Sequence, residues 1–256
     1  MKKSTSERFS GLAQSYSKSR PSYPQSAVDY IFETGQLKAG STIADVGCGT
    51  GISSRLFARA GVHVIGVEPN EDMLSQAKEN DTTSGGTVEY RSGTAEATGL
   101  PDSCANLVLC AQAFHWFRSN ESLAEFSRIL KNDGYCALIW NERDHKIEAT
   151  AAYGNVVIKY SNDPAIELKR GASGKDLILS NLFEMVGVFE FTNSQSLDLD
   201  ALIGRAFSTS YMPHEGEQLK KAQSEIKEVF AQHSKDGLIT LSYATTLYLA
   251  RKKSDK

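Results

Sequence analysis

Three glycines at alternate positions, Gly47, Gly49 and Gly51, directly follow a short apolar run and precede a helical pattern. A glycine can adopt positive φ, and it lets a ligand approach the backbone where a Cβ would otherwise stand. The backbone N–H groups of such a turn, at the start of a helix, point towards a bound ligand. Asp45 stands two residues before the first glycine. This stretch therefore predicts a site for a nucleotide-like ligand.

The spacing of the glycines narrows the choice of nucleotide. The dinucleotide pattern G-x-G-x-x-G, counted from Gly47, requires a third glycine where this chain has Ile52, and Gly51 comes one position too early. That shift disfavours NAD and FAD. About 20 residues further on, the apolar run 62–67 ends at Glu68, where an acid at a strand end binds ribose hydroxyls in nucleotide folds. Glu68 predicts an adenosine ligand without selecting a cofactor.

The pattern G-x-G-x-G preceded by Asp45 resembles the first motif of the Rossmann-like (class I) methyltransferases that use S-adenosylmethionine (SAM). Within that class it resembles the small-molecule group with a type 11 or type 25 methyltransferase domain. The resemblance implies that Gly47 and Gly49 admit the aminocarboxypropyl and ribose parts of SAM. Asp45 would hold the amino group directly or through water, and Cys48 would contribute backbone contacts only. The cofactor residues predicted in these two turns are Asp45, Gly47, Cys48, Gly49, Gly51, Glu68 and Pro69.

Two further segments extend the resemblance. Residues 91–101 resemble the family's adenine-edge segment, in which this chain has Thr94 where the family has an acid. An adenine contact is implied from the Ala95 N–H group, with the side chain of Thr94 or Glu96 as a second partner. Near the N-terminus, residues 16–24 resemble the family's Tyr…Arg-Pro…Tyr-Pro leader. The leader implies that Arg20 clamps the cofactor carboxylate, which suits the planar guanidinium.

The end of the fourth predicted strand holds the candidate catalytic residue. Residues 111–117 are similar to the Ala-x-Ala-x-His-Trp-Phe of small-molecule methyltransferases, and ligands bind beyond the carboxyl ends of parallel strands. Ala111 is predicted to contact the cofactor. His115 is a candidate general base or substrate partner, and the alternative is a packed, structural histidine, because methyl transfer often needs no protein base. The aromatic residues beside it form either a wall against the sulfonium or part of the core: Phe114, Trp116 and Phe117.

A parallel sheet is needed to bring these residues together. Apolar runs alternate with helical periodicity from Thr42 to Trp140, which predicts such a sheet. Strands are expected near 42–46, 63–67, 87–91, 106–110 and 135–140, with helices near 52–60, 71–79 and 121–130. An inserted helical lid is expected over 142–183. It is followed by a strand from Phe183 to Phe191, helical segments over 198–233, and a last strand from Leu238 to Leu249 that forms a hairpin-like antiparallel edge with its predecessor.

The predicted fold class is therefore α/β, a doubly wound, seven-stranded, mostly parallel sheet with a helical cap. We expect a single domain over residues 1–256. Its core is predicted at about 25–141 and 184–250, and its cap elements at about 1–24, 142–183 and 198–235.

The composition favours a small-molecule partner. The 256 residues are 40% hydrophobic and 23% charged, with a formal net charge of -3 and a pI near 6.0, so there is no basic field for a nucleic-acid backbone. No window approaches the roughly 18 apolar residues of a membrane span, and the N-terminus leads into no apolar signal segment. A cytoplasmic protein is expected. The four cysteines form no C-x-x-C pair, so neither a metal site nor a disulfide framework is predicted.

These observations predict a SAM-dependent methyltransferase that acts on a small molecule, with the acceptor and the oligomeric state left open. Two alternatives also stay open. An NAD(P)-dependent oxidoreductase shares the acidic strand end. A SAM-binding module without transferase activity shares every cofactor residue and differs in lacking a substrate cavity.

Overall fold

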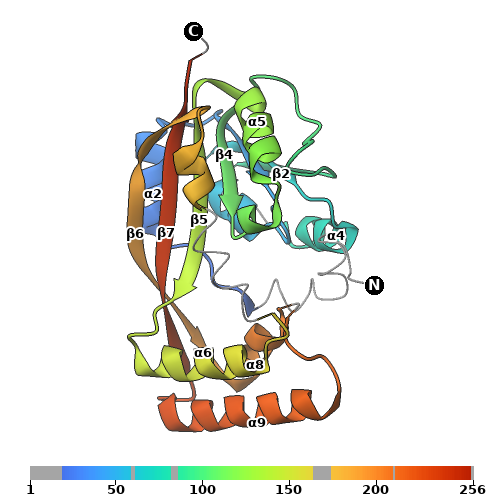
Figure 1. Ribbon diagram of the computed structural model, residues 1–256, viewed down its shortest axis with the longest axis vertical. Helices are drawn as coiled ribbons and strands as arrows, with labels where there is room; N and C mark the ends of the chain where they lie inside the picture. The colour runs from blue at the N-terminus through green and yellow to red at the C-terminus, as the bar shows by residue number, and fades with distance from the viewer. Residues whose placement is uncertain (1–18, 59–60, 82–85, 164–173, 210, 255–256) are drawn as a thin grey trace.

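Seven strands form one sheet with helices on both of its faces in the computed structural model (Figure 1). The structure describes residues 19–58, 61–81, 86–163, 174–209 and 211–254. The strands are β1 (Thr42–Val46), β2 (His63–Val67), β3 (Thr87–Arg91), β4 (Ala105–Ala111), β5 (Leu130–Arg143), β6 (Phe183–Leu197) and β7 (Ile239–Lys252). The helices are α2 (Gln25–Thr34), α3 (Ile52–Ala58), α4 (Glu71–Glu79), η2 (Phe114–Trp116), α5 (Ser119–Ile129), α6 (Glu148–Tyr160), α8 (Leu199–Phe207) and α9 (Gly216–His233).

The strand order in the sheet is β3-β2-β1-β4-β5-β7-β6. Strands β1 to β5 pair in parallel, and β7 is antiparallel to both of its neighbours. The predicted α/β fold with a mostly parallel, seven-stranded sheet is confirmed. β1 and β2 are almost completely buried because helices cover both faces of the sheet, and this is why they read as continuous apolar runs in the sequence.

Two hydrophobic clusters lie on opposite faces of the sheet. On one face, Ile31 of α2 and Phe57 of α3 belong to the cluster that includes Ile43 of β1. On the other face, Phe126 and Ile129 of α5 belong to the second cluster. The helices thereby hold the parallel strands in place, and the loops after β1, β2 and β4 meet at the edge formed by the carboxyl ends of these strands.

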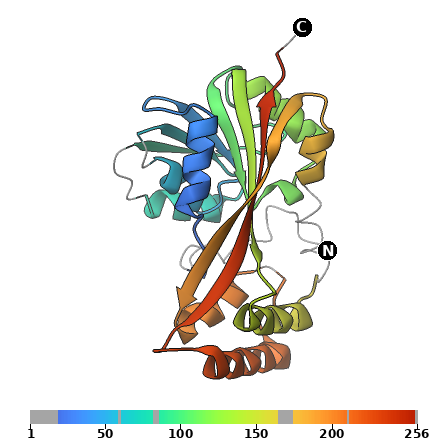
Figure 2. The same cartoon turned by 90° about the vertical axis from the view of Figure 1, so that its left-hand side faces the viewer.

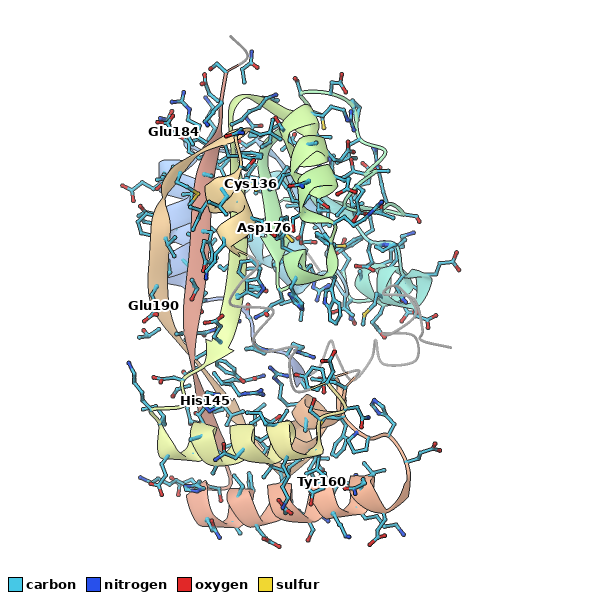
Figure 3. The ribbon with its side chains drawn as sticks, in the orientation of Figure 1. Cys136, His145, Tyr160, Asp176, Glu184 and Glu190 are labelled. Atoms are coloured by element: carbon cyan, nitrogen blue, oxygen red, sulfur yellow. The ribbon has the colours of Figure 1, made fainter. Side chains whose placement is uncertain are left out.

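The cap is carried on long strands. β5, β6 and β7 contain 14, 15 and 14 residues, whereas β1, β2 and β3 contain 5 each. Figure 2 shows β6 and β7 running together from the sheet down to α6, α8 and α9. The cap has its own hydrophobic cluster, with Tyr153, Leu202 and Ile226 coming from the three helices. Figure 3 shows Tyr160 where α6 meets α9, and its hydroxyl donates to Glu225 at 2.6 Å.

The cap agrees with one expectation and differs from another. The last two strands pair antiparallel at one edge of the sheet as predicted, with β6 outermost, and the helical segments predicted between them are observed as α8 and α9. Residues 20–24 of the first predicted cap element are not helical, because Pro21 and Pro24 fix φ and lack an N–H donor. Residues 1–18 of that element and 164–173 of the predicted lid lie outside the described residues.

Candidate functional site

The turn after β1 places all three glycines at positive φ, with Gly47 at 73°, Gly49 at 55° and Gly51 at 76°. A Cβ on Gly47 would stand 2.7 Å from the Cβ of Ala113 and 2.8 Å from the Cζ of Phe117, so the turn has to approach the loop after β4 as bare backbone. A Cβ on Gly49 would meet no atom within 4 Å. Gly49 therefore faces open space in which a ligand can lie against the backbone.

The Glu68 carboxylate joins this turn to the next helix. Glu68 follows β2 and is 9% exposed. Its Oε2 accepts a hydrogen bond from the Gly49 N–H at 3.0 Å, and its Oε1 accepts one from the Asn70 N–H at 2.9 Å. Asn70 also caps α4, because its side chain accepts from the Met73 N–H at 2.9 Å. Burial raises the pKa of Glu68, and the two N–H donors oppose that rise. Each carboxylate oxygen keeps a lone pair for a further donor.

Asp45 is fully buried in β1. Its Oδ2 accepts hydrogen bonds from the hydroxyls of Ser53 at 2.7 Å and Ser54 at 2.6 Å, both on α3. Burial raises the pKa of Asp45 to about 6, although these hydroxyls oppose the rise. Its Oδ1 has no hydrogen-bond partner among the described residues. A buried carboxylate oxygen without a donor is a suitable position for an amino group or for a water that relays to one.

A pocket of about 410 Å³ lies over these loops, within the range of roughly 300–1,000 Å³ that is usual for small-molecule sites. It brings together loops that follow β1, β2, β3 and β4. Of the residues predicted to bind the cofactor, it is lined by Gly47, Gly49, Glu68, Pro69, Thr94, Ala95, Glu96 and Ala111.

The loop after β3 holds the predicted adenine contacts. The Oγ1 of Thr94 accepts from the Ala97 N–H at 3.2 Å within a tight turn. The Oε1 of Glu96 accepts from the Arg118 N–H at 3.0 Å. Burial disfavours the charged form of Glu96, but hydrogen bonds outweigh it and hold the pKa of Glu96 below its usual value. Both side chains keep acceptor positions for a further donor, so the choice between Ala95, Thr94 and Glu96 as the adenine contact stays a prediction.

A smaller cavity, of about 50 Å³, adjoins the pocket and shares Gly47 and Gly49 with it. Arg20 and Cys48 line this smaller cavity. Asp45 and Gly51 line neither cavity. A Cβ on Gly51 would collide with the hydroxyl of Tyr90, so the close approach that this glycine allows is to the protein itself.

The segment that carries Arg20 is held by its backbone carbonyls. The Ser19 carbonyl accepts from the Gln195 side chain at 3.1 Å. The Ser22 carbonyl accepts from the side chains of Asn141 at 3.1 Å and Asn193 at 2.8 Å. Polar side chains of β5 and β6 thus fix the leader on both sides of Arg20.

Residues 44–138 match the protein family described as "Methyltransferase domain". The chain contains a methyltransferase domain. The match begins within β1 and ends within β5. It therefore includes the glycine turn, Glu68, the adenine-edge loop and the loop after β4.

Relatives and solved structures extend the likeness beyond this domain. The chain is 29% identical over 247 residues to an uncharacterized methyltransferase-like protein of Schizosaccharomyces pombe, with 94% of each chain covered. It is 29% identical over 227 residues to an uncharacterized methyltransferase of Mycobacterium tuberculosis, covering 88% of this chain and 86% of that one. The solved YcgJ protein of Bacillus subtilis superposes with a TM-score of 0.55 at 17% identity, and the match covers 91% of this chain and 100% of that one. A structure described for the conversion of a disulfide bond into a thioacetal group during echinomycin biosynthesis gives a TM-score of 0.62 at 16% identity, covering 98% and 93%. These likenesses show the Rossmann-like methyltransferase fold.

The candidate base of the methyltransferase domain, His115, does not line either cavity. Its Nδ1 lies 3.4 Å from the Nε1 of Trp140, which can only donate, and its ring lies 4.7 Å from that of Trp116. An imidazole that accepts at Nδ1 carries its proton on Nε2, so neither ring nitrogen is left to accept a proton from a substrate. This arrangement favours the structural alternative for His115, and its catalytic role stays a prediction.

The aromatic residues around His115 divide between the two expected roles. Trp116 and Phe117 line the pocket, whereas Phe114 is completely buried in the core. Further lining residues were not predicted: Met73, Gln112, Ala113 and Arg118. Gln112, at φ 59°, directly follows β4, so its position after a parallel strand was the available signal.

Within the described ranges, no three His, Cys, Asp or Glu side chains gather as a metal ion would need. Likewise, none of the helices in the described part of the chain combines the length and the apolar character required to cross a membrane.

Proposed function

We propose that this methyltransferase takes its methyl group from SAM and transfers it to a small-molecule acceptor. The observation that carries the choice of SAM over NAD is the strand order, taken with the domain match. Dinucleotide folds are built from two mononucleotide-binding halves with the parallel order 3-2-1-4-5-6. Here the strand next to β5 is β7, which is antiparallel to it. The sixth parallel strand of the second half, which would help to hold the nicotinamide nucleotide, is therefore replaced by an antiparallel strand.

Three features of the site fit SAM. Gly49 leaves open space beside a backbone with positive φ. Glu68 borders the pocket with a lone pair on each oxygen left for the ribose hydroxyls. Asp45 keeps one buried oxygen without a partner among the described residues, next to the turn where the amino group of SAM would lie.

The protein's part in the reaction is to bind, to orient and to exclude water. SAM, when bound, supplies a methyl group already activated by its positive sulfur. Glu68 and Ala95 would fix the adenosine. Trp116 and Phe117 are among the other residues that line the pocket, and aromatic faces favour a cation. Because the positive charge disappears as the methyl leaves, positioning and exclusion of water supply catalysis without an obligatory base.

The proposal of a small acceptor rests on charge and on the loop after β4. A formal net charge of -3 provides no field for a nucleic-acid backbone. The residues that follow β4 are aromatic and apolar at Trp116 and Phe117, as expected for a compact organic acceptor. We place the reaction in the cytoplasm as part of the same proposal.

Calorimetric titration of the purified protein with SAM, S-adenosylhomocysteine and NADH tests the cofactor. We expect binding of the first two compounds and none of NADH; binding of NADH alone would overturn the proposal in favour of an oxidoreductase. Incubation with methyl-labelled SAM and fractionated metabolite extracts then tests the reaction. A labelled product that forms only when the protein is present supports the proposed methyl transfer. SAM binding with no labelled product in any fraction would favour the binding module instead.

A further inference from the structure

The smaller cavity continues the cofactor pocket beyond the glycine turn. The two spaces share Gly47, Gly49, Ala111 and Gln112 in their linings, so one elongated ligand can extend from the pocket into the cavity. Arg20 and Arg205 line this cavity but not the pocket. Arg205 belongs to α8, a cap helix that lies about 150 residues beyond the glycine turn in the sequence.

Arg205 is a buried cation without a matching anion among the described residues. It is 6% exposed, and its Nε has no hydrogen-bond partner among the described residues. No carboxylate in the described part of the chain pairs with it. A guanidinium stays charged at any physiological pH, and a buried charge is strongly unfavourable unless it is paired. Because none of the described residues supplies a carboxylate, the charge of Arg205 points to an anion supplied by a ligand.

The described groups that act on the Arg205 guanidinium are the phenols of Tyr153, Tyr211 and Tyr243, and the Tyr243 side chain hydrogen-bonds to it. Burial raises the pKa of Tyr153 to about 12, so its phenol is neutral at pH 7. Neutral phenols orient a guanidinium but do not balance its charge.

The fold holds Arg205 next to the leader that carries Arg20. Gly204, the residue before Arg205, lies so close to Ser19 that a Cβ on it would stand 3.6 Å from the Ser19 Oγ. The Tyr243 hydroxyl donates to the Gln195 side chain at 3.5 Å, and Gln195 in turn donates to the Ser19 carbonyl at 3.1 Å. Cap helix, strand and leader thus meet at one end of the cofactor site.

We propose that Arg205 binds the α-carboxylate of SAM together with Arg20, so that a cap helix completes the cofactor site. This inference rests on the proposed function. With the ribose at Glu68, the aminocarboxypropyl tail would extend past Gly47 into the smaller cavity, and the carboxylate is the only anion that SAM carries there. A guanidinium suits it, because its planar fork matches two carboxylate oxygens.

The test compares SAM with decarboxylated SAM, which differs from it in lacking the carboxylate. Calorimetry gives the ratio of the two dissociation constants for the wild type, Arg205→Met, Arg205→Lys and Arg143→Met. We expect the wild type to prefer SAM by about one to two powers of ten, and Arg205→Met to lose roughly tenfold of that preference. Arg205→Lys keeps the charge without the fork and should give an intermediate ratio.

Arg143→Met is the matched control. Arg143 also lies near Tyr153, with its Cζ 5.8 Å from the ring centre, but it lines neither cavity, so its replacement should leave the ratio unchanged. Both ligands are measured with the same variant, so a loss of protein stability affects both dissociation constants alike and cancels in their ratio. Equal binding of SAM and decarboxylated SAM by the wild type would overturn the carboxylate site, and an unchanged ratio in Arg205→Met would show that Arg205 only supports the cap. A wild type that binds neither ligand would refute the proposed cofactor itself.

Discussion

Replacing Glu68 with alanine should weaken SAM binding while leaving the fold intact. In the structure, the Glu68 carboxylate borders the pocket, and each of its oxygens accepts one hydrogen bond, from the N–H of Gly49 or of Asn70. An ionised carboxylate offers about four acceptor positions. Two therefore stay available, which is the number that the two ribose hydroxyls require.

The size of the effect follows from these two bonds. A hydrogen bond to a charged acceptor contributes roughly 1.5–3 kcal/mol. Water that enters the space left by the side chain recovers part of this energy, so we expect a loss of about one to three powers of ten in affinity. The variant also removes the partner of the Gly49 and Asn70 N–H groups, which should lower the free energy of unfolding by about 1–3 kcal/mol.

Calorimetry with S-adenosylhomocysteine measures the affinity, and urea unfolding of the same samples measures the stability. Glu71→Ala is the matched control: Glu71 begins α4, is exposed and does not line the pocket, so its replacement removes an equal charge nearby without changing affinity by more than about twofold. If Glu68→Ala stays folded and binds within twofold of the wild type, the ribose does not lie at Glu68 and the assignment of the pocket is wrong.

Three further predictions concern other parts of the site. Because the pKa of Asp45 is raised to about 6 from 3.8, the native state holds this proton more tightly than the unfolded chain. The free energy of unfolding should thus fall as pH rises from about 4 to about 6, by up to about 3 kcal/mol, and Asp45→Asn should flatten this dependence in urea titrations at several pH values. Gly49→Ala and Gly216→Ala should each cost about 1–2 kcal/mol, since both glycines have positive φ and open space, but calorimetry should show at least a tenfold loss of cofactor affinity for Gly49→Ala alone. His115→Gln should lower kcat by less than about tenfold with an unchanged pH profile; loss of one limb of that profile would establish His115 as the base.

The parallel half of the sheet could be predicted because its signals are local. β1 and β2 are apolar runs with turn residues at both ends, and they were placed to the residue at 42–46 and 63–67. Gly49 follows β1 and Glu68 follows β2, so one helix and one strand separate them, and both lie at the carboxyl ends of adjacent parallel strands. The hydrogen bond between them at 3.0 Å joins these two predicted cofactor residues.

The second half of β6 could not be predicted in the same way. After Phe191 the strand continues through Thr192, Asn193, Ser194, Gln195 and Ser196, a polar run that shows no apolar alternation. None of these residues belongs to the hydrophobic clusters of the described structure. Asn193 and Gln195 instead donate to the leader carbonyls of Ser22 and Ser19. Contacts between residues more than 170 positions apart leave no local pattern in the sequence. Arg205 could not be predicted for the same reason, because it lines the smaller cavity together with Gly49, which is distant from it in the sequence.

The continuity of β6 and β7 bears on how the cap and the cofactor site work together. Their antiparallel pairing runs from Phe183↔Lys252 in the core to Leu197↔Ile239 in the cap, with one irregularity between Met185 and Gly187, far from the cap. A hinge between core and cap would have to break ladder hydrogen bonds, each contributing about 1 kcal/mol net. The sheet therefore holds α8 at a fixed distance from the glycine turn. Selection of the acceptor then depends on the side chains that the cap helices present, because rotation of the cap as a body is opposed by the ladder that carries it.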